Sequence, residues 1–242
     1  MAGDTVSARM RPRPSFIAWA LFGLGLLGGV LDGCGSSSSG NGVASKTPNE
    51  IVAASKAAAD GARSAHVSGS IVSGGTPITL DLDLVSRGGR GQLALNGLAV
   101  ELIQTSGTVY IKGSEVFYRH IGRAAAARVL RGRWLKAPTT TPKLASISSL
   151  TDLHKLIDAT LPSRGTLVKT GTNKVTGKQV VGMRDRSTGE TLYVAATGQP
   201  YPVQIASGDT GGGTVSFDRW NEKVSITPPA NAIDITQLRA GH

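Results

Sequence analysis

The chain has 242 residues, with 26 lysines and arginines against 16 aspartates and glutamates, which gives a net charge of +10. This length suits one folded domain with a sizeable core, so stability requires neither a metal nor a covalent crosslink. The single cysteine, Cys34, excludes an internal disulfide. The positive charge suits anionic lipid head groups or acidic polymers, whereas the lack of a basic stripe interleaved with aromatic residues disfavours nucleic acid.

Residues 1–33 are typical of a secretory signal peptide. Three arginines among residues 9–13 precede an apolar run over residues 16–31, and the small Gly33 stands directly before Cys34. The apolar run has 16 residues, whereas a helix needs roughly 20 to cross a bilayer. An uncleaved transmembrane anchor is therefore the weaker interpretation.

The end of this segment, Leu31-Asp32-Gly33-Cys34, resembles the lipobox of bacterial lipoproteins. Asp32 departs from the small uncharged residue that this group prefers. The resemblance implies cleavage at a site flanked by Leu31 and Gly33, a diacylglycerol on Cys34, and an anchored protein on the extracytoplasmic side of the cell membrane. The alternative is that Cys34 is an incidental free thiol.

Removal of residues 1–33, which hold three arginines and two aspartates, leaves 209 residues with a net charge of +9. Residues 34–47 are rich in glycine and serine and are expected to form a flexible tether. Its first eight residues after Cys34 would span about 15 Å as a random coil. A single domain is expected over residues 48–237, followed by a short tail at 238–242.

The domain is expected to begin with a helix at 48–63, after which the apolar period changes from helical to alternating. Short links rich in glycine join the alternating segments, and Asn96-Gly97 is a strong hairpin signal, so the pairing should be antiparallel. The expected strands are 67–71, 78–84, 93–95, 98–105, 108–112, 166–172, 178–184, 191–195, 202–207, 214–220 and 223–226.

Residues 119–161 interrupt the strands. An alanine-rich helix is expected around 122–130, and a second helix at 147–161 carries a leucine stripe at helical spacing. The apolar face of the second helix needs a partner, and the inner face of the sheet is available.

Four phrases, in order with the lipobox, resemble the actinobacterial lipoprotein family that includes LppX, LprA, LprF and LprG. They are Arg63-Ser-Ala-His-Val-Ser-Gly69, Ser106-Gly-Thr-Val-Tyr-Ile-Lys112, Arg133-Trp-Leu-Lys136 and Phe217-Asp-Arg-Trp-Asn221 running to Pro228-Pro229-Ala230. The likeness spans about residues 48–235.

In that family a strongly curved antiparallel sheet, similar to that of LolA and LolB, forms a half-barrel. Helices close its concave side over a hydrophobic cavity, and members carry acylated lipids or glycolipids across the envelope. The resemblance implies an α+β half-barrel with helices on its concave side, an acylated cargo and a membrane transporter as partner. It does not identify the lipid.

The apolar faces of the strands and the leucine-striped helix supply the candidate cavity lining. These residues are Ile78, Leu80, Leu82, Leu84, Leu93, Leu95, Val100, Leu102, Leu150, Leu153, Leu156 and Ile157. The alternative is that the helix fills the concavity, which would leave a membrane-tethered structural or adaptor module without a lipid cargo.

Between Val116 and Thr151 the chain has seven lysines or arginines and no acidic residue. Such a cluster suits an anionic head group or membrane surface. The candidate docking residues are Arg119, Arg123, Arg128, Arg131 and Arg133. The alternative is a solvated basic loop.

The sequence predicts no enzyme, cofactor or metal site, and it predicts a monomer. The only dinucleotide-type glycine pattern, at residues 23–28, lies inside the signal peptide, and the four histidines are isolated from one another. Asp81 and Asp83 share one strand face, but that face opposes the apolar one, so they are expected to be solvated surface carboxylates.

Overall fold

The computed structural model describes residues 40–73, 75–120, 127–141, 149–161, 166–208 and 212–235. The signal peptide, the lipobox with Leu31, Gly33 and Cys34, and the docking candidate Arg123 lie outside the described residues. The described residues fall within one compact unit, Ser38–His242.

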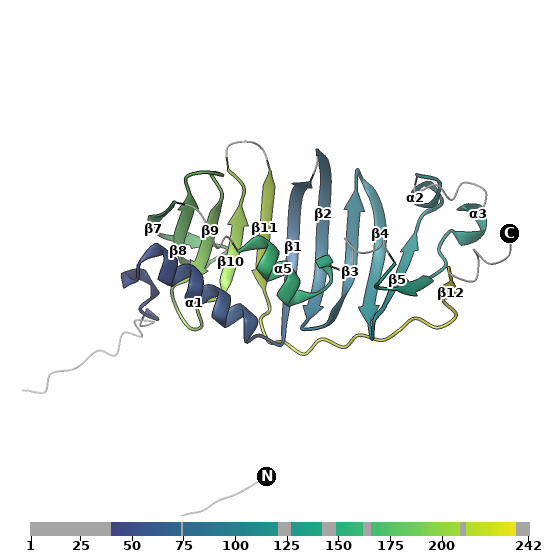
Figure 1. Ribbon diagram of the computed structural model, residues 1–242, viewed down its shortest axis with the longest axis horizontal. Coiled ribbons are helices and arrows are strands. Elements are labelled where there is room, and N and C mark those ends of the chain that lie inside the picture. The colour runs from purple at the N-terminus through teal and green to yellow at the C-terminus, as the bar shows by residue number, and fades with distance from the viewer. Residues whose placement is uncertain are drawn as a thin grey trace, which may run out of the picture. The chain divides into compact units, whose positions relative to one another are not determined.

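One twelve-stranded sheet dominates this unit (Figure 1). Its strand order is β12-β6-β5-β4-β3-β2-β1-β11-β10-β9-β8-β7. All neighbours pair antiparallel except β12 and β6, which are parallel. The sheet is curved and unclosed, which confirms the predicted half-barrel.

The strands are β1 (Ser64–Ser73), β2 (Thr76–Val85), β3 (Gly88–Leu95), β4 (Leu98–Thr105), β5 (Thr108–Gly113), β6 (Leu135–Pro138), β7 (Leu167–Val175), β8 (Lys178–Asp185), β9 (Thr191–Ala195), β10 (Pro202–Ala206), β11 (Gly213–Asp218) and β12 (Ile233–Asp234). The helices are η1 (Val43–Ser45), α1 (Pro48–Asp60), α2 (Glu115–His120), α3 (Ala127–Leu130) and α5 (Leu153–Thr160).

Strands β1 and β11 join the two sets of strands predicted on either side of the helical interruption. Val67 faces Phe217 and Gly69 faces Val215 across this pair. We call β1–β6 with α2 and α3 the arginine half, and β7–β11 with α1 the tether half. The two halves share one sheet and therefore one inner face.

Two glycines allow close backbone approach within the sheet. Gly69 in β1 has φ 144° and Gly91 in β3 has φ 150°. A Cβ atom would lie 2.0 Å from the carbonyl oxygen of Thr214 at Gly69, and 2.1 Å from that of Asp81 at Gly91. Only glycine fits both the conformation and the space, and such glycines are typical of sharply curved sheets.

Helices α1 and α5 cross the same face of the sheet in Figure 1. Helix α1 begins with a capping box, in which Glu50 N donates to Thr47 Oγ1 and Thr47 N donates to the Glu50 carboxylate. It contacts β7, β9 and β10. The apolar stripe of α5, predicted from its spacing, is buried in the same cluster as the inner residues of β2–β4.

Helix α2 was not predicted, and of the helix expected around 122–130 only residues 127–130, which form α3, lie within the described residues. Four further details differ from the sequence prediction. The helix expected over 147–161 is broken, because Asp152 is extended and its side chain caps α5 by accepting from Lys155 N. Residues 223–226 form no strand. Strands β6 and β12 were not predicted; they are only four and two residues long, too short to show alternation.

The fourth difference concerns the tether. Val43 is 1 % exposed within the core, and Asn41 hydrogen-bonds the β9–β10 segment. Residues 41–45 are therefore attached to the body, although their composition is that of a linker. The flexible tether expected over 34–47 therefore does not include residues 41–45.

Candidate functional site

The candidate cavity residues share one side of the sheet. Nine of them are buried in a single apolar cluster: Leu80, Leu82, Leu84, Leu93, Val100, Leu102, Leu153, Leu156 and Ile157. Leu95 and Leu150 are partly buried against this cluster. Ile78 is half-buried near the end of β2, opposite Leu95. Strand alternation and one helix stripe thus bring eleven of the twelve together, and we call this the aliphatic cluster.

Two helices cover the inner face of the sheet: α5 packs into the aliphatic cluster, and α1 lies over β7, β9 and β10. Lys56 of α1 donates to Asp158 of α5 at 2.5 Å and to Asp60 at 2.8 Å. These bonds, chiefly that to Asp158, raise the pKa of Lys56 above its ordinary value. The side chains are 38 % and 62 % exposed for Lys56 and Asp158, so the pair contributes at most about 1 kcal/mol. Apolar burial of α5 holds the cover more than this ion pair does.

Buried polar groups lie at two places beneath this cover. Thr151 Oγ1 donates to Gln104 Oε1 at 2.8 Å, and both side chains are buried. Ser55 of α1 is fully buried, and its hydroxyl has no hydrogen-bond partner within the described part of the chain. An unpaired buried hydroxyl costs about 1–3 kcal/mol, so Ser55 is suited to a ligand that brings an acceptor.

The pockets in the described part of the chain include two that flank the sheet. One, of about 540 Å³, lies at the β7–β8 and β9–β10 turns. The other, of about 340 Å³, lies beside β4 and β5 and includes Val100, Glu101, Lys112 and Arg131. Val100 is the one candidate cavity residue that lines either of these two pockets.

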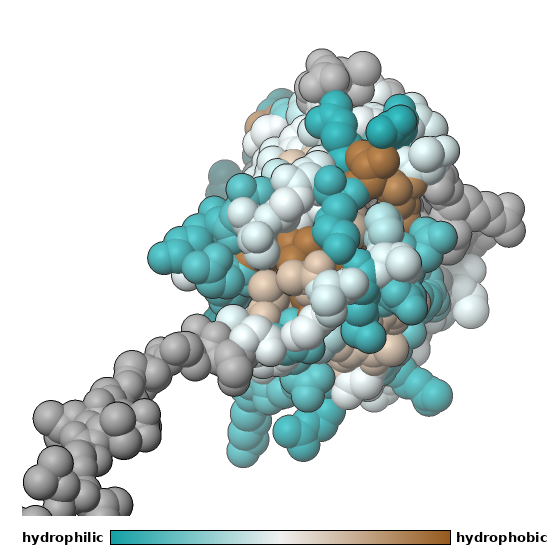
Figure 2. Space-filling model, turned by 90° about the vertical axis from the view of Figure 1, so that its left-hand side faces the viewer, coloured by the Kyte–Doolittle hydropathy of each residue, from teal (hydrophilic) through white to brown (hydrophobic). Residues whose placement is uncertain are grey.

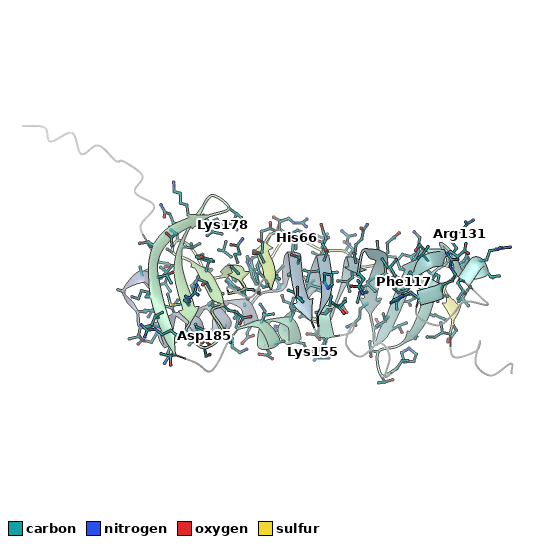
Figure 3. All side chains as sticks on the ribbon, turned by 90° about the horizontal axis from the view of Figure 1, so that it is seen from above. His66, Phe117, Arg131, Lys155, Lys178 and Asp185 are labelled. Carbon is teal, nitrogen blue, oxygen red and sulfur yellow. The ribbon has the colours of Figure 1, made fainter. Side chains whose placement is uncertain are left out.

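The arginines of the predicted docking segment lie in the arginine half, which Figure 3 shows at the other end of the sheet from Lys178 and Asp185. Arg119, Arg128, Arg131 and Arg133 are exposed, and within the described residues none of them forms an ion pair. We call these four residues the arginine patch.

Exposed apolar side chains accompany the arginine patch. Val116 of α2 is 49 % exposed and Val129 of α3 is 70 % exposed. Below them, Tyr118 is fully buried, accepts from Gly113 N and donates to the carbonyl oxygen of Arg133. Burial raises the pKa of Tyr118. The arginines and valines are therefore exposed together above the buried, hydrogen-bonded Tyr118.

The carboxylates considered for catalysis are engaged in surface ion pairs. Asp83 contacts Arg219 at 2.8 Å and Arg90 at 3.4 Å. Asp81 lies 3.1 Å from Nε2 of His66, whose Nδ1 lies 2.7 Å from Asp218. In Figure 3, His66 is on the side of the sheet away from Lys155 of α5.

The described residues contain no group of three or more metal-ligating side chains close enough to hold an ion. In the same part of the chain, no helix has both the length and the hydropathy needed to span a bilayer.

No sequence pattern indicated the larger surface pocket. Its lining includes Lys174, Lys178, Tyr201 and Trp220, which come from three separate parts of the chain. Trp220 packs against the core. No periodic pattern or motif links it to the two lysines, because only the strand order brings the turns together.

No protein-family model matches the sequence, and a search of curated proteins finds no match. Solved structures do match. LprF from Mycobacterium bovis aligns with a TM-score of 0.53 and 14 % identity, over 76 % of this chain and 97 % of LprF. Lipoprotein LppX from Mycobacterium tuberculosis aligns with a TM-score of 0.49 and 15 % identity, over 74 % of this chain and 98 % of LppX. The chain therefore has the fold of mycobacterial LprF, as its resemblance to the LppX, LprA, LprF and LprG lipoproteins predicts.

Proposed function

We propose that this protein is a cell-envelope lipoprotein, anchored through Cys34, that binds an acylated lipid or glycolipid and carries or presents it across the envelope. The cargo would occupy the space between the inner face of the sheet and the α1–α5 cover. The cargo-bound protein would work as a monomer and exchange cargo with a membrane transporter. It would perform no catalysis.

The observation that carries this proposal is the continuous aliphatic cluster beneath a cover of short helices. Each buried CH2 group of an acyl chain contributes about 0.8 kcal/mol, so displacing α5 from the sheet offers an acyl chain a surface already lined by leucines. Helix α5 has eight residues, and its ion pairs to α1, Lys56–Asp158 and His154–Asp60, are exposed. Such a displacement therefore breaks few polar contacts.

The buried Ser55 hydroxyl supports a lipid cargo in a second way. An acyl ester carries carbonyl oxygens that accept hydrogen bonds, whereas the side chains of the aliphatic cluster do not. A cargo ester placed beneath α1 would satisfy the Ser55 hydroxyl, which lacks a partner within the described residues.

Lipid extraction tests the proposal directly. Non-acylated Cys34→Ala protein, folded in its native host, is extracted with organic solvent and the organic phase is analysed by mass spectrometry. We expect a stoichiometric acylated lipid. Protein that yields no lipid, and takes none up from vesicles, would contradict the carrier function.

Ser55→Ala provides a matched test of the cargo site. Removal of an unpaired buried hydroxyl should stabilise the lipid-free protein, whereas loss of a hydrogen bond to cargo should weaken lipid retention by about tenfold. Ser45→Ala, at an exposed position in η1, is the control. If Ser55→Ala stabilises the lipid-free protein but leaves lipid retention unchanged, the hydroxyl does not contact cargo.

A structural or adaptor module is the second candidate. The observation in its favour is that eleven of the twelve candidate residues pack with one another, while Val100 alone of them lines either surface pocket described above. Absence of lipid in the extraction experiment, with a normally folded protein, would support this candidate.

We also propose that the arginine patch, together with the candidate Arg123, docks onto an anionic membrane or receives phosphate-bearing head groups. Cations beside exposed valines suit the interface of an anionic leaflet, where each basic residue contributes about 1 kcal/mol.

A further inference from the structure

The larger pocket lies at the edge of the sheet where two turns of the tether half meet the segment after β11. Its lining residues are Lys174, Gly177, Lys178, Gln179, Ala195, Thr197, Gln199, Tyr201, Val203 and Trp220. No acidic residue is among them. Figure 2 views the molecule from the β7 end, where hydrophilic side chains surround a central apolar area. We call this pocket the turn pocket.

Two lysines give the turn pocket its charge. Thr176 and Gly177, with φ 48° and 80°, form the tight turn between β7 and β8. Lys174 and Lys178 flank this turn, both exposed, and neither forms an ion pair with any described residue. Two unpaired cations beside the amides of Gln179 and Gln199 suit an anion with further oxygen atoms.

The aromatic wall of the turn pocket is held in place. Tyr201 and Trp220 stack with ring centroids 4.5 Å apart and planes 6° apart. Asn221 Nδ2 donates to the hydroxyl of Tyr201 at 2.7 Å, and Phe217 stacks against Trp220 from the core. Trp220 Nε1 is buried and has no hydrogen-bond partner within the described residues, so the stacked pair gives the pocket an apolar wall.

The tether enters the body next to this pocket. Asn41 N donates to the carbonyl oxygen of Ala196 at 2.9 Å, and Asn41 Nδ2 donates to those of Ala195 and Gly198 at 2.9 and 3.0 Å. Seven residue steps separate Cys34 from Asn41, so their Cα atoms are at most about 25 Å apart and about 15 Å apart on average in a flexible chain. An acyl group on Cys34 would hold the turn pocket within reach of the head groups of its own membrane.

We infer that the turn pocket binds the phosphate of an anionic phospholipid head group in the membrane that carries the anchor. Lys174 and Lys178 contact the phosphate, the amides of Gln179 and Gln199 donate to its oxygens, and Tyr201 and Trp220 form the apolar wall beside it. This inference rests on the proposed anchor at Cys34. It does not require a lipid cargo in the aliphatic cluster, and it involves the opposite half of the sheet from the arginine patch.

The test uses the mature chain, residues 34–242, with Cys34→Ala, so that neither the apolar signal segment nor an acyl group contributes to binding. Co-sedimentation compares vesicles of phosphatidylcholine with vesicles that also contain phosphatidylglycerol. Lys174→Gln with Lys178→Gln removes both pocket cations. The matched control, Lys155→Gln with Arg186→Gln, removes two exposed cations elsewhere and leaves the same net charge.

We expect the pocket variant to lose about thirtyfold in affinity for phosphatidylglycerol vesicles, as two juxtamembrane cations would provide, and the control to lose far less. Equal losses in the two variants would reduce the effect to net charge and overturn the inference. So would unchanged binding in the pocket variant.

A second measurement separates the phospholipid from free phosphate. The indole NMR signal of Trp220, assigned with a Trp134→Phe variant, should shift on adding phosphatidylglycerol vesicles or soluble glycerol 3-phosphate, and much less with inorganic phosphate. A shift with inorganic phosphate and none with vesicles would make this a site for free anions and overturn the inference. A protein that yields no lipid on extraction can still give the expected result in both of these measurements. Failure of the cargo proposal is therefore distinguishable from failure of the turn-pocket inference.

Discussion

The two halves of the sheet present positive charge in different ways. In the tether half, Lys174 and Lys178 border a concave pocket with a fixed aromatic wall, and the chain from Cys34 enters beside it. In the arginine half, the arginines lie on short helices and the adjoining chain, near exposed valines. A pocket can select a head group, whereas an open patch responds to surface charge. The difference predicts specificity at one end and salt-sensitive attraction at the other.

Removal of the anchor proposed at Cys34 has the largest expected effect on this comparison. Cys34→Ala should move the protein from the membrane to the soluble fraction, because two-chain lipidation is what makes anchoring stable. Only the turn pocket and the arginine patch would then contact membranes. Fractionation and lipid extraction on the same sample measure the two properties. Loss of cargo together with anchoring would mean that Cys34 has a role in cargo binding too.

A change at the β1–β11 pair, which joins the two halves, has the next largest expected effect. Gly69→Ala would place a Cβ atom 2.0 Å from the carbonyl oxygen of Thr214 in β11, so we expect the free energy of unfolding to fall by about 3 kcal/mol or more. Urea unfolding measures the fall. Gly61→Ala is the control, because Gly61 has φ −79° and a Cβ there would lie 3.5 Å from its nearest neighbour.

The same pair of variants tests whether the halves unfold as one unit. If they do, hydrogen exchange should accelerate in both halves of the Gly69→Ala protein. A loss of stability no larger than in Gly61→Ala would contradict the close approach of β1 and β11.

Charge reversal in the arginine patch has a smaller expected effect. Arg128→Glu with Arg131→Glu, in the Cys34→Ala protein, should weaken binding to anionic vesicles by roughly thirtyfold or more at low salt, with the difference shrinking as salt screens the charges. Lys155→Glu with Arg186→Glu is the charge-matched control. Unchanged vesicle binding would remove the docking role of the patch.

Acid should lower the stability of the tether half, and this is the smallest of the expected effects. Hydrogen bonds from Ser187, first from its hydroxyl and then from its backbone N–H, lower the pKa of Asp185. A carboxyl with a lowered pKa stabilises the fold above its unfolded pKa of about 3.9, and this contribution is lost as pH falls through the folded value.

Asp185→Asn should therefore lower Tm modestly at pH 7, and the difference from wild type should disappear as pH falls below about 4. Glu50, whose pKa is lowered by its hydrogen bonds to Thr47, also lies in the tether half. A Tm difference that stays constant with pH would show that the Asp185 charge does not contribute.

Local pattern was sufficient to predict most strands. Strands β4 and β9 have the predicted bounds, because alternation and glycine-rich turns act within a few residues. Asp152 was harder to interpret, since an aspartate within a leucine-striped segment is compatible with a helix interior or with a cap. Its extended backbone is a local outcome that spacing does not reveal.

The candidate sites also differ in how far local pattern indicates them. The aliphatic residues could be grouped from sequence because each is fixed by the face of its own strand or helix, and their role as a cavity lining stays a prediction. The turn pocket was not, because Lys174, Tyr201 and Trp220 meet only after β7–β11 are placed in order.

By itself, the sequence determined the antiparallel hairpins, the apolar face of each element and the resemblance to a lipoprotein family, since these depend on neighbouring residues and motifs. Only the tertiary structure decided that β1 pairs with β11, that α1 and α5 cover one shared face, and that the tether enters beside two lysines and a stacked Tyr–Trp pair. These features join residues more than 100 positions apart, such as His66 and Asp218. Contacts of that range form only when the whole apolar surface is buried at once, and no local pattern encodes them.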